Sequence, residues 1–360
     1  MEAMTGIERI GNILKHQPVD RIGAFEHFWV DTAAKWAEQG HMGQYEIPAD
    51  HFGFDMDMMW AFHMVADLDF EPKVEEETEE TILAWDGNGA LFRRHKLHSA
   101  TPEHVRFSVK TREDWEERIK PHLVADSRRI FMDAYKWAKQ YCAEKGRFFV
   151  TCQPNVFELI HPVIGHEGLL FAMADDPEWV EDMVTTYANL IVELQEITFA
   201  EAGKPDGIWY YEDMGYRANP FMSPRMYREM IWAGHAKTFG FAHAQGLPVI
   251  VHSCGFVEPL LPDMIEAGMD CLQVMEVKAG MDPVRIHRSY GERIALMGGI
   301  DVRVLYSNDI AKVDAELEEK IPLLKEGYGY VLHSDHSIPY TVEHETYKHF
   351  LEKGLELGTY

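Results

Sequence analysis

A histidine and a cysteine stand two positions apart in the segment His252-Ser253-Cys254-Gly255, directly after the apolar residues 247–251. This apolar run is typical of a buried strand, and the loop after it leads to a predicted helix near Glu258. Imidazole nitrogen and thiolate sulfur are ligands that zinc binds in a tetrahedral shell. A His-x-Cys pair alone also fits a packed histidine beside an inert cysteine, so further ligands must decide between the two interpretations.

Three other predicted strands end in side chains that can bind a metal ion or transfer a proton. Residues 207–211, 270–275 and 328–332 are apolar runs, and each is followed by acidic residues or histidines. With the His-x-Cys pair, the groups at these strand ends are Glu212, Asp213, His252, Cys254, Glu276, His333, Asp335 and His336. One polar residue at a strand end is routine, but this many groups at four strand ends predict a functional site.

Helices that alternate with these strands set the expected architecture. Ser223-Pro224 supplies a capping hydroxyl and a proline at the first helical position, so a helix is expected from there to about Gln245. Further helices are expected over 258–267, from Pro283, and over 309–326, with another strand at 293–297. This alternation favours parallel strands with helical crossovers, and a chain without linkers fits one (β/α)8 TIM-type barrel over residues 1–360. All strands of such a barrel end at one face, where catalytic groups gather.

Other segments are expected to lie outside this repeat. Residues 71–110 are charged and contain two β-prone runs around Asp86-Gly87-Asn88-Gly89, which predicts a hairpin excursion from the N-terminal part of the barrel. The acidic run 74–80 within it is expected to be a solvated edge. Residues 113–145 have the pattern of a helix, and a helix over 343–357 either packs on the barrel or contributes to a homo-oligomer interface.

The composition argues against several classes of protein. Asp and Glu number 60 against 34 Lys and Arg, and the formal net charge of −26 repels nucleic acids and anionic membranes. No stretch of about 20 apolar residues and no signal-peptide pattern is evident in the sequence. The four cysteines suggest no disulfide framework, so we expect a cytoplasmic protein in which Cys254 stays available as a thiolate.

Several motifs give the chain a resemblance to the uroporphyrinogen decarboxylase superfamily along nearly its whole length. They are residues 18–22 (PVDRI), Asp213-Met214-Gly215 with residues 223–227, the His-x-Cys segment, residues 297–301 (MGGID) and the late segment 336–339 (HSIP). The chain is more similar to the branch of zinc-dependent, corrinoid-linked methyltransferases than to the decarboxylase itself. The resemblance implies a TIM barrel that uses zinc and works with a corrinoid (cobalamin) held on a separate corrinoid protein.

The resemblance also implies a set of metal ligands when it is transferred position by position. That branch binds zinc through a His-x-Cys pair and a downstream cysteine, with an acidic residue nearby. The corresponding residues here are His252, Cys254, Glu276 and His336. The histidine replaces the downstream cysteine, and His333 or Asp335 takes its place if the late loop is displaced by a residue or more. A hydrogen-bonded polar cluster without a metal ion is the alternative.

Two replacements argue against uroporphyrinogen decarboxylation. In our alignment Phe62 stands where the decarboxylase has the aspartate that holds the pyrroles. Its arginine-rich stretch for the substrate carboxylates corresponds here to Glu26-His27-Phe28-Trp29. A substrate with many carboxylates requires cationic partners, which aromatic side chains do not supply.

The implied ligand set favours a substrate that contains oxygen. Zinc with one thiolate is a harder Lewis acid than zinc with two, and it suits a methyl ether or methanol. We therefore expect transfer of a methyl group from an O-methyl substrate, with a methoxylated aromatic preferred, to a Co(I) corrinoid. Asp213 or Glu212 is the candidate general acid, although helix capping accounts equally well for Asp213. The alternatives are methyl transfer from the corrinoid to a thiol or pterin acceptor, the decarboxylase reaction, and a barrel that only binds a ligand.

The preference for an aromatic substrate rests on side chains near the predicted strand ends. The N-terminal third is rich in methionine and aromatic residues, most of which are expected to belong to the core. Those expected to form an apolar pocket wall are Trp29, Trp60, Phe62, Tyr210 and Tyr211. His27 is placed where it can hydrogen-bond a ring substituent, although such a histidine is more often structural.

Overall fold

The computed structural model describes residues 3–96 and 101–360; residues 1–2 and 97–100, which belong to the predicted domain and its excursion, lie outside the described part. An eight-stranded parallel sheet forms the centre, with the strand order β1-β14-β13-β12-β11-β8-β7-β2. These strands are β1 (Gly23–Ala24), β2 (Met56–Trp60), β7 (Phe148–Pro154), β8 (Gly207–Tyr211), β11 (Val249–Ser253), β12 (Cys271–Val274), β13 (Ala295–Gly298) and β14 (Tyr330–Leu332). This sheet and its helices form the predicted TIM-type barrel.

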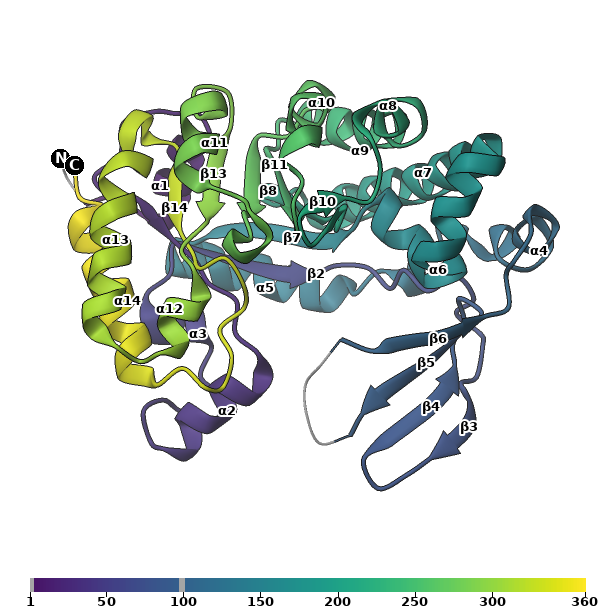
Figure 1. The fold of residues 1–360 in the computed structure, drawn as a ribbon, viewed down its shortest axis with the longest axis horizontal. Helices are drawn as coiled ribbons and strands as arrows, with labels where there is room; N and C mark the ends of the chain where they lie inside the picture. Colours follow the sequence, from purple (N-terminus) through teal and green to yellow (C-terminus); the bar gives the residue numbers. More distant parts are fainter. Residues whose placement is uncertain (1–2, 97–100) are drawn as a thin grey trace.

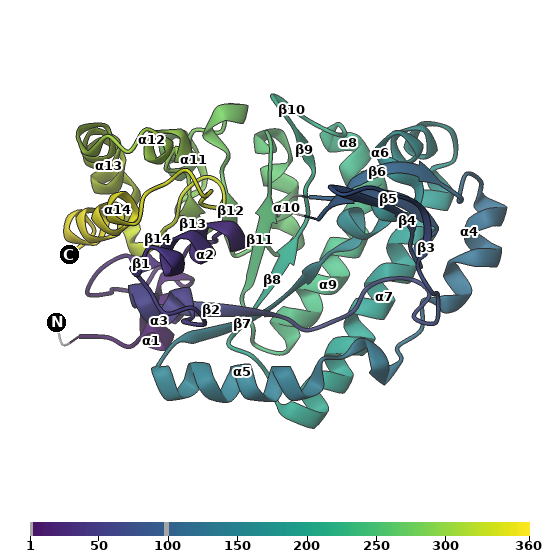
Figure 2. The same cartoon turned by 90° about the horizontal axis from the view of Figure 1, so that it is seen from below.

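Most helices cover the outside of the sheet, whereas α4 lies at the periphery of the molecule beyond α6 (Figures 1 and 2). The helices are α1 (Gly6–Ile13), α2 (Val30–Glu38), α3 (Pro48–Phe52), α4 (Arg112–Arg118), α5 (Met132–Lys145), α6 (Val156–Asp175), α7 (Pro177–Ala202), α8 (Pro224–Met226), α9 (Trp232–Ala244), α10 (Leu261–Ala267), α11 (Pro283–Tyr290), α12 (Val302–Tyr306), α13 (Ile310–Leu324) and α14 (His344–Leu357). The helix predicted from Ser223 is confirmed, since the Ser223 hydroxyl accepts a hydrogen bond from Met226 N–H at 3.2 Å. A π-helical turn at Tyr227–Ile231 joins α8 to α9.

The barrel is not closed by a continuous ladder, because β1 has two residues and pairs with β14 but not with β2. One residue bridges the gap between β1 and β2. Asp55 N–H donates to the Ala24 carbonyl at 3.0 Å, and the Asp55 carboxylate accepts the Ala24 N–H at 2.8 Å. Arg9 and Arg21 both form ion pairs with this carboxylate. A charged cluster therefore replaces the ladder at the amino-terminal end of this seam.

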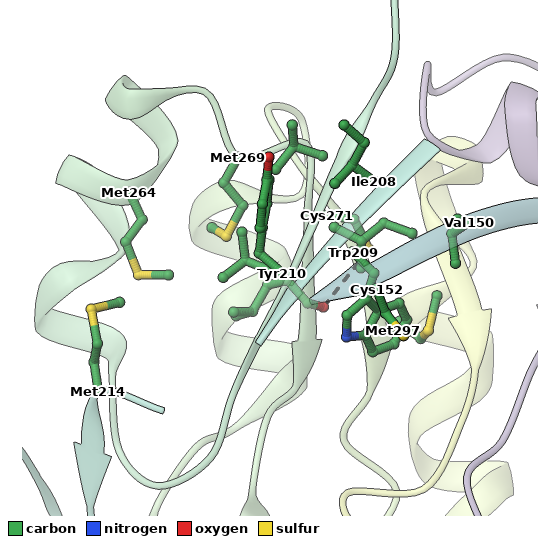
Figure 3. Close-up of a cluster of buried hydrophobic side chains, with 14 of the residues drawn as sticks. Val150, Cys152, Ile208, Trp209, Tyr210, Met214, Met264, Met269, Cys271 and Met297 are labelled. Atoms are coloured by element: carbon green, nitrogen blue, oxygen red, sulfur yellow. Dashed lines mark hydrogen bonds between the residues drawn. The ribbon is translucent and has the colours of Figure 1, made fainter. Parts of the chain in front are cut away.

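The two faces of each barrel strand meet different surroundings, and β8 illustrates this. Trp209 points into the barrel beside Cys152 and Met297, whereas Tyr210 points to the opposite side of the strand, toward Met269 (Figure 3). Both side chains are fully buried. Because side chains alternate along a strand, Tyr211 returns to the interior face at the carboxyl end.

The predicted hairpin excursion is part of a larger antiparallel sheet, which extends away from the barrel (Figure 1). Its strands are β3 (Lys73–Glu77), β4 (Thr81–Trp85), β5 (Ala90–His95) and β6 (Glu103–Phe107). Strands β4 and β5 form the expected hairpin. Every residue of β3 is exposed, so the prediction of a solvated acidic edge is confirmed.

The helix predicted over residues 113–145 is confirmed at its two ends, in α4 and α5, but the chain leaves the helical path between them. The buried guanidinium of Arg129 donates to five backbone carbonyls, those of His63, Val65, Ala66, His122 and Val124. Two of these carbonyls belong to residues 122–124, which must turn around the guanidinium and are not available for helical bonds. A buried arginine has thus replaced helical hydrogen bonding in this segment.

Helix α6 has the length and apolar composition of a membrane-spanning helix, contrary to the expectation that no such stretch exists. Of its most apolar 18-residue window, 56% is buried inside the protein, as is common in core helices. Gly165, at φ 76° and ψ 160°, interrupts the helix beside the ring of Phe107.

Candidate metal centre and active site

Three side chains at the carboxyl ends of β8 and β11 converge to a group with one nitrogen, one sulfur and one oxygen donor. The potential ligand atoms of Asp213, His252 and Cys254 all lie within 4.8 Å of one another. His252 Nε2 is 3.3 Å from Cys254 Sγ and 3.4 Å from Asp213 Oδ1. These donor types suit zinc, and three protein ligands leave a fourth position for water or substrate.

Two glycines allow the loops that carry these ligands to approach each other closely. A Cβ atom on Gly215 would lie 2.3 Å from the Cys254 carbonyl oxygen, and one on Gly255 would lie 2.5 Å from the Gly215 carbonyl carbon. Gly255 also has φ of +74°, which an L side chain rarely adopts. Cys254 N–H donates to Asp213 Oδ1 at 2.8 Å, so the same contact fixes the carboxylate beside the thiol.

Gln273 on β12 determines which nitrogen of His252 is free. Its Oε1 can only accept a hydrogen bond, so the contacting Nδ1 of His252 must carry the proton. The bare Nε2 is therefore the nitrogen that faces Cys254 and Asp213. This arrangement matches the usual support of a metal-binding histidine, whose second nitrogen donates to an oxygen acceptor.

The hydrogen bonds continue from Gln273 across the barrel interior. His333 Nδ1 lies 2.5 Å from the Ser334 carbonyl, so its Nε2 is the acceptor. That Nε2 lies 3.4 Å from Gln273 Nε2 and 2.9 Å from His27 Nδ1. His27 Nε2 then accepts from the Tyr211 hydroxyl at 3.2 Å. One set of tautomers therefore links Tyr211 to His252. It requires a proton on Glu26, whose Oε1 lies 3.1 Å from the bare His333 Nε2, and burial raises the pKa of this carboxyl well above its usual value.

The electrostatic environment of Cys254 favours a cation. Burial raises the pKa of its thiol well above the usual value, and the neighbouring Asp213, Glu276 and Glu158 raise it further. Lys278 acts in the opposite direction, but its ammonium is paired with Glu276 at 3.0 Å. A divalent ion at the three ligand atoms would supply the missing positive charge and allow the thiolate to form. The residues present therefore fit a zinc ion.

Two predicted ligands lie outside the three-residue group. Glu276 uses Oε2 to accept the Gly255 N–H at 2.7 Å, and its Oε1 pairs with Lys278, so it supports the Cys254 loop. His336 is half-buried with its ring 6.4 Å from that of Trp29. Asp213, predicted as a general acid or cap, is the third member of the group instead.

The two alternatives for the late loop are also engaged elsewhere. His333 belongs to the interior chain, and burial lowers its pKa to about 3. Asp335 accepts the N–H groups of Val277 and Val302 at 2.8 and 2.7 Å. Burial raises the pKa of Asp335 to about 6 despite these hydrogen bonds.

Glu212 is not placed for proton transfer at this centre, and that prediction is corrected. Its fully buried carboxylate accepts the N–H groups of Phe157 and Glu158 at 2.8 and 3.0 Å and pairs with His235 at 2.5 Å. These partners lie at the start of α6 and on α9. Glu212 therefore joins the end of β8 to two helices, and the helix dipole stabilises its charge.

Aromatic rings extend from the three-residue group to the surface. The rings of His252 and Tyr211 lie 4.9 Å apart, and Trp60 stacks on Tyr211 at 5.0 Å with 5° between the ring planes. Trp60 is 48% exposed, so one end of this aromatic wall is open. His27, which accepts from Tyr211, also lies 3.0 Å from Met58 Sδ.

Three other predicted wall residues have different positions. Tyr210 bonds to Gln195 on α7 through its hydroxyl at 3.0 Å, so its assignment to the pocket is wrong. Phe62 is 4% exposed and lies beyond β2, bridged to Ile130, so it does not line an open wall either. Trp29 precedes α2 and lines a cavity at the β1–β2 seam together with His27.

Some groups near the centre had no direct signal in the sequence. Glu158 accepts the Asp213 N–H at 3.3 Å and pairs with His161 at 3.0 Å. Both belong to α6, which we did not predict. Gln273 was inside a predicted strand, and the position of that strand beside β11 was the only information that could have indicated its role.

Comparison with known proteins agrees with this architecture. The family model for uroporphyrinogen decarboxylase (URO-D) matches residues 156–355, which include the three-residue group. The chain belongs to the uroporphyrinogen decarboxylase family. This URO-D family chain also matches the solved structure of a methyltransferase from Methanosarcina mazei, with a TM-score of 0.68 and 18% identity over 98% of this chain and 99% of that one. At this identity the match shows a shared fold.

More distant matches add nothing to this assignment. Xylanase B from Clostridium stercorarium F9 gives a TM-score of 0.35 at 12% identity, over 60% of this chain and 75% of that one. A Xaa-Pro dipeptidase gives 0.27 at 12% identity, over 62% and 63% of the two chains. The search of curated proteins returned no match.

Proposed function

We propose that this URO-D family protein is a zinc-dependent methyltransferase that removes the methyl group of a methoxylated aromatic compound. The observation that carries the proposal is the convergence of Asp213, His252 and Cys254 at the mouth of the barrel. The full-length likeness to a methyltransferase from Methanosarcina mazei supports the reaction class. We place the reaction in the cytoplasm, where the Cys254 thiol stays reduced.

The methyl acceptor in this proposal is the Co(I) corrinoid of a separate corrinoid protein, which acts as a second substrate. The methyl–oxygen bond breaks and a methyl–cobalt bond forms with the electron pair of Co(I). The departing aryl oxygen keeps the electron pair of the broken bond and takes up one proton from solvent. Bound zinc would supply Lewis-acid polarisation of the ether oxygen.

The protein's own residues have defined tasks. His252, Cys254 and Asp213 hold the metal ion, and Gln273 keeps His252 in the tautomer that can bind it. The exposed face of Trp60, backed by Tyr211, offers a surface on which an aromatic ring can stack. Because this wall ends at His252, a ring stacked on it is directed toward the three ligand atoms.

Elemental analysis of His252→Ala and Cys254→Ala tests the metal centre. Each variant should lose one equivalent of zinc relative to wild type, since each lacks one of three ligands. Cys271→Ala is the matched control, because Cys271 is a fully buried thiol on β12 outside the group. Wild-type protein should then transfer methyl groups from methoxylated aromatics to Co(I) cobalamin. The absorbance change on conversion of Co(I) cobalamin to methylcobalamin measures this transfer. Unchanged zinc in both ligand variants would refute the proposed centre.

The same assay distinguishes methyl transfer to the corrinoid from methyl transfer away from it. With methylcobalamin and a thiol or a pterin in place of the ether, the alternative reaction would consume methylcobalamin. Faster turnover in that direction, with no turnover of any ether, would refute O-demethylation but leave the metal centre intact.

A further inference from the structure

A cavity of about 320 Å3 lies at the seam between β1 and β2, bounded by the start of α2 and by α3. Part of its lining is the segment 25–30, which follows β1 directly, so the cavity lies toward the carboxyl end of the seam. Its volume is in the range of pockets that bind small molecules. Most of its lining side chains are apolar, and the larger ones are Phe25, Phe28, Trp29, Ile47, Phe54 and Met58.

Two lining residues connect the cavity to the aromatic wall. His27 Nε2 lies 3.2 Å from the Tyr211 hydroxyl, and Met58 Sδ lies 3.8 Å from the same hydroxyl. The centroid of the Tyr211 ring is 4.9 Å from that of His252 and 6.5 Å from that of His27. Tyr211 therefore stands between the metal-binding group and the cavity, with its hydroxyl end at the cavity.

The charges around the cavity disfavour an anion. Among the described residues that line it, none is a lysine or an arginine. Glu26 is turned away to accept the Ser334 N–H at 2.9 Å, whereas the side chain of Asp57 is 24% exposed. Burial raises the pKa of Asp57, and Arg147, 4.0 Å away, is already paired with Asp50 at 2.6 Å. A carboxylate on a ligand would lose its hydration here without gaining a cation.

We propose that this cavity binds an uncharged apolar substituent of the methoxylated ring and so selects neutral alkyl-substituted aryl ethers as substrates. The inference rests on the proposed methyl transfer, because the metal-binding group fixes the methoxy end of the ring. A ring held at Tyr211 with its methoxy group toward His252 presents its opposite end to the cavity. A short alkyl chain para to the methoxy group then leaves water for an apolar environment.

A series of 4-alkylanisoles measures the contribution of the cavity to binding. Calorimetry with zinc-loaded protein, without a corrinoid, gives the dissociation constants of the methyl, ethyl and propyl compounds. Each added CH2 should lower the wild-type dissociation constant about fourfold, because it is buried. 4-Methoxybenzoate should bind more weakly than 4-isopropylanisole, which has a similar shape without the charge. 4-Methoxybenzylamine should bind more weakly than 4-ethylanisole for the corresponding reason.

Ala33→Leu tests whether the effect of chain length arises in this cavity. Ala33 lines the cavity from α2, so a leucine there should occupy the space and make the dissociation constant independent of chain length. Ala33→Met fills the same space with a more flexible side chain and should act in the same direction. Ala34→Leu is the matched control, since Ala34 is exposed on the same helix, and it should keep the fourfold step.

The cavity proposal and the methyl-transfer proposal fail separately. A series without a chain-length step in wild type, or with the wild-type step in both Ala33 variants, overturns the cavity as the site of the substituent. Tighter binding of the benzoate or of the amine than of its uncharged counterpart overturns the choice of a neutral group. A step that the Ala33 variants lose, with no methyl transfer from any of these ethers to Co(I) cobalamin, supports the cavity as a binding site and overturns O-demethylation.

Discussion

Replacing Gln273 with methionine is expected to weaken zinc binding at His252 without removing a ligand. Gln273 is fully buried, and its Oε1 accepts the Nδ1–H that leaves Nε2 of His252 bare. Without that acceptor, the imidazole can move its proton to Nε2 and rotate. Losing such a partner typically reduces metal affinity by about 10- to 100-fold, which corresponds to about 1.4–2.7 kcal/mol. The orphaned Nδ1–H also costs about 1–3 kcal/mol of folding free energy.

Competition with a chromogenic chelator measures this change in the zinc dissociation constant. Gln153→Met is the matched control, because Gln153 is a buried glutamine on β7 that pairs in register with Tyr210, on the side of the sheet away from His252. Gln273→Glu keeps an acceptor for Nδ1 and should retain most of the affinity. Urea titrations check that Gln273→Met is folded before its zinc affinity is measured. If the folded variant has a zinc dissociation constant within twofold of wild type, the idea that Gln273 holds His252 ready to bind zinc through Nε2 is refuted.

Two further perturbations test the surroundings of the centre. Gly215→Ala should move the Cys254 loop, because the new Cβ would lie 2.3 Å from a backbone atom. We expect zinc binding at least about tenfold weaker and a folding free energy reduced by about 1–3 kcal/mol. Gly240→Ala is the control, since its new Cβ would meet no atom within 4 Å, and it should be neutral or stabilising. Asp335, with its pKa raised from 3.8 to about 6, binds protons more tightly when folded, so wild type should lose about 3 kcal/mol of unfolding free energy as pH rises from about 4 to 6. Asp335→Asn lacks this component, and equal pH slopes for both proteins in urea titrations would contradict it.

The barrel was predictable because its signals are local and repeated. Each apolar run from residue 207 onward formed a strand within two residues of its expected limits, and the helices between them began at residues such as Ser223 and Pro283 that favour helix starts. The segment between α4 and α5 was not predictable, since a charged arginine usually indicates an exposed helical face. Only the folded chain brings the carbonyls that bind Arg129 together around its guanidinium.

The sequence predicted at which strand ends the site lies, but it did not predict which atoms of those residues face one another. Position at a strand end identified His252, Cys254 and Asp213 as neighbours, but it could not distinguish a side chain directed into the mouth from one bound to backbone. Glu212 shows the limit, since it stands beside Asp213 in sequence and yet serves the start of α6. Such distinctions depend on the pleat of the strand and on distant N–H groups, neither of which a short motif specifies.

The incomplete ladder between β1 and β2 has a consequence for the order in which molecules enter and leave. The seam adjoins a cavity of about 320 Å3 lined by His27, Trp29 and Met58 among others. His27 also contacts Tyr211 of the aromatic wall, so this cavity and the wall share a residue. The hydrogen bonds between Asp55 and Ala24 and the contact between the rings of Phe25 and Phe54 close the seam itself. A small molecule at the aromatic wall would therefore have to bind before a large protein covers the open end of the barrel.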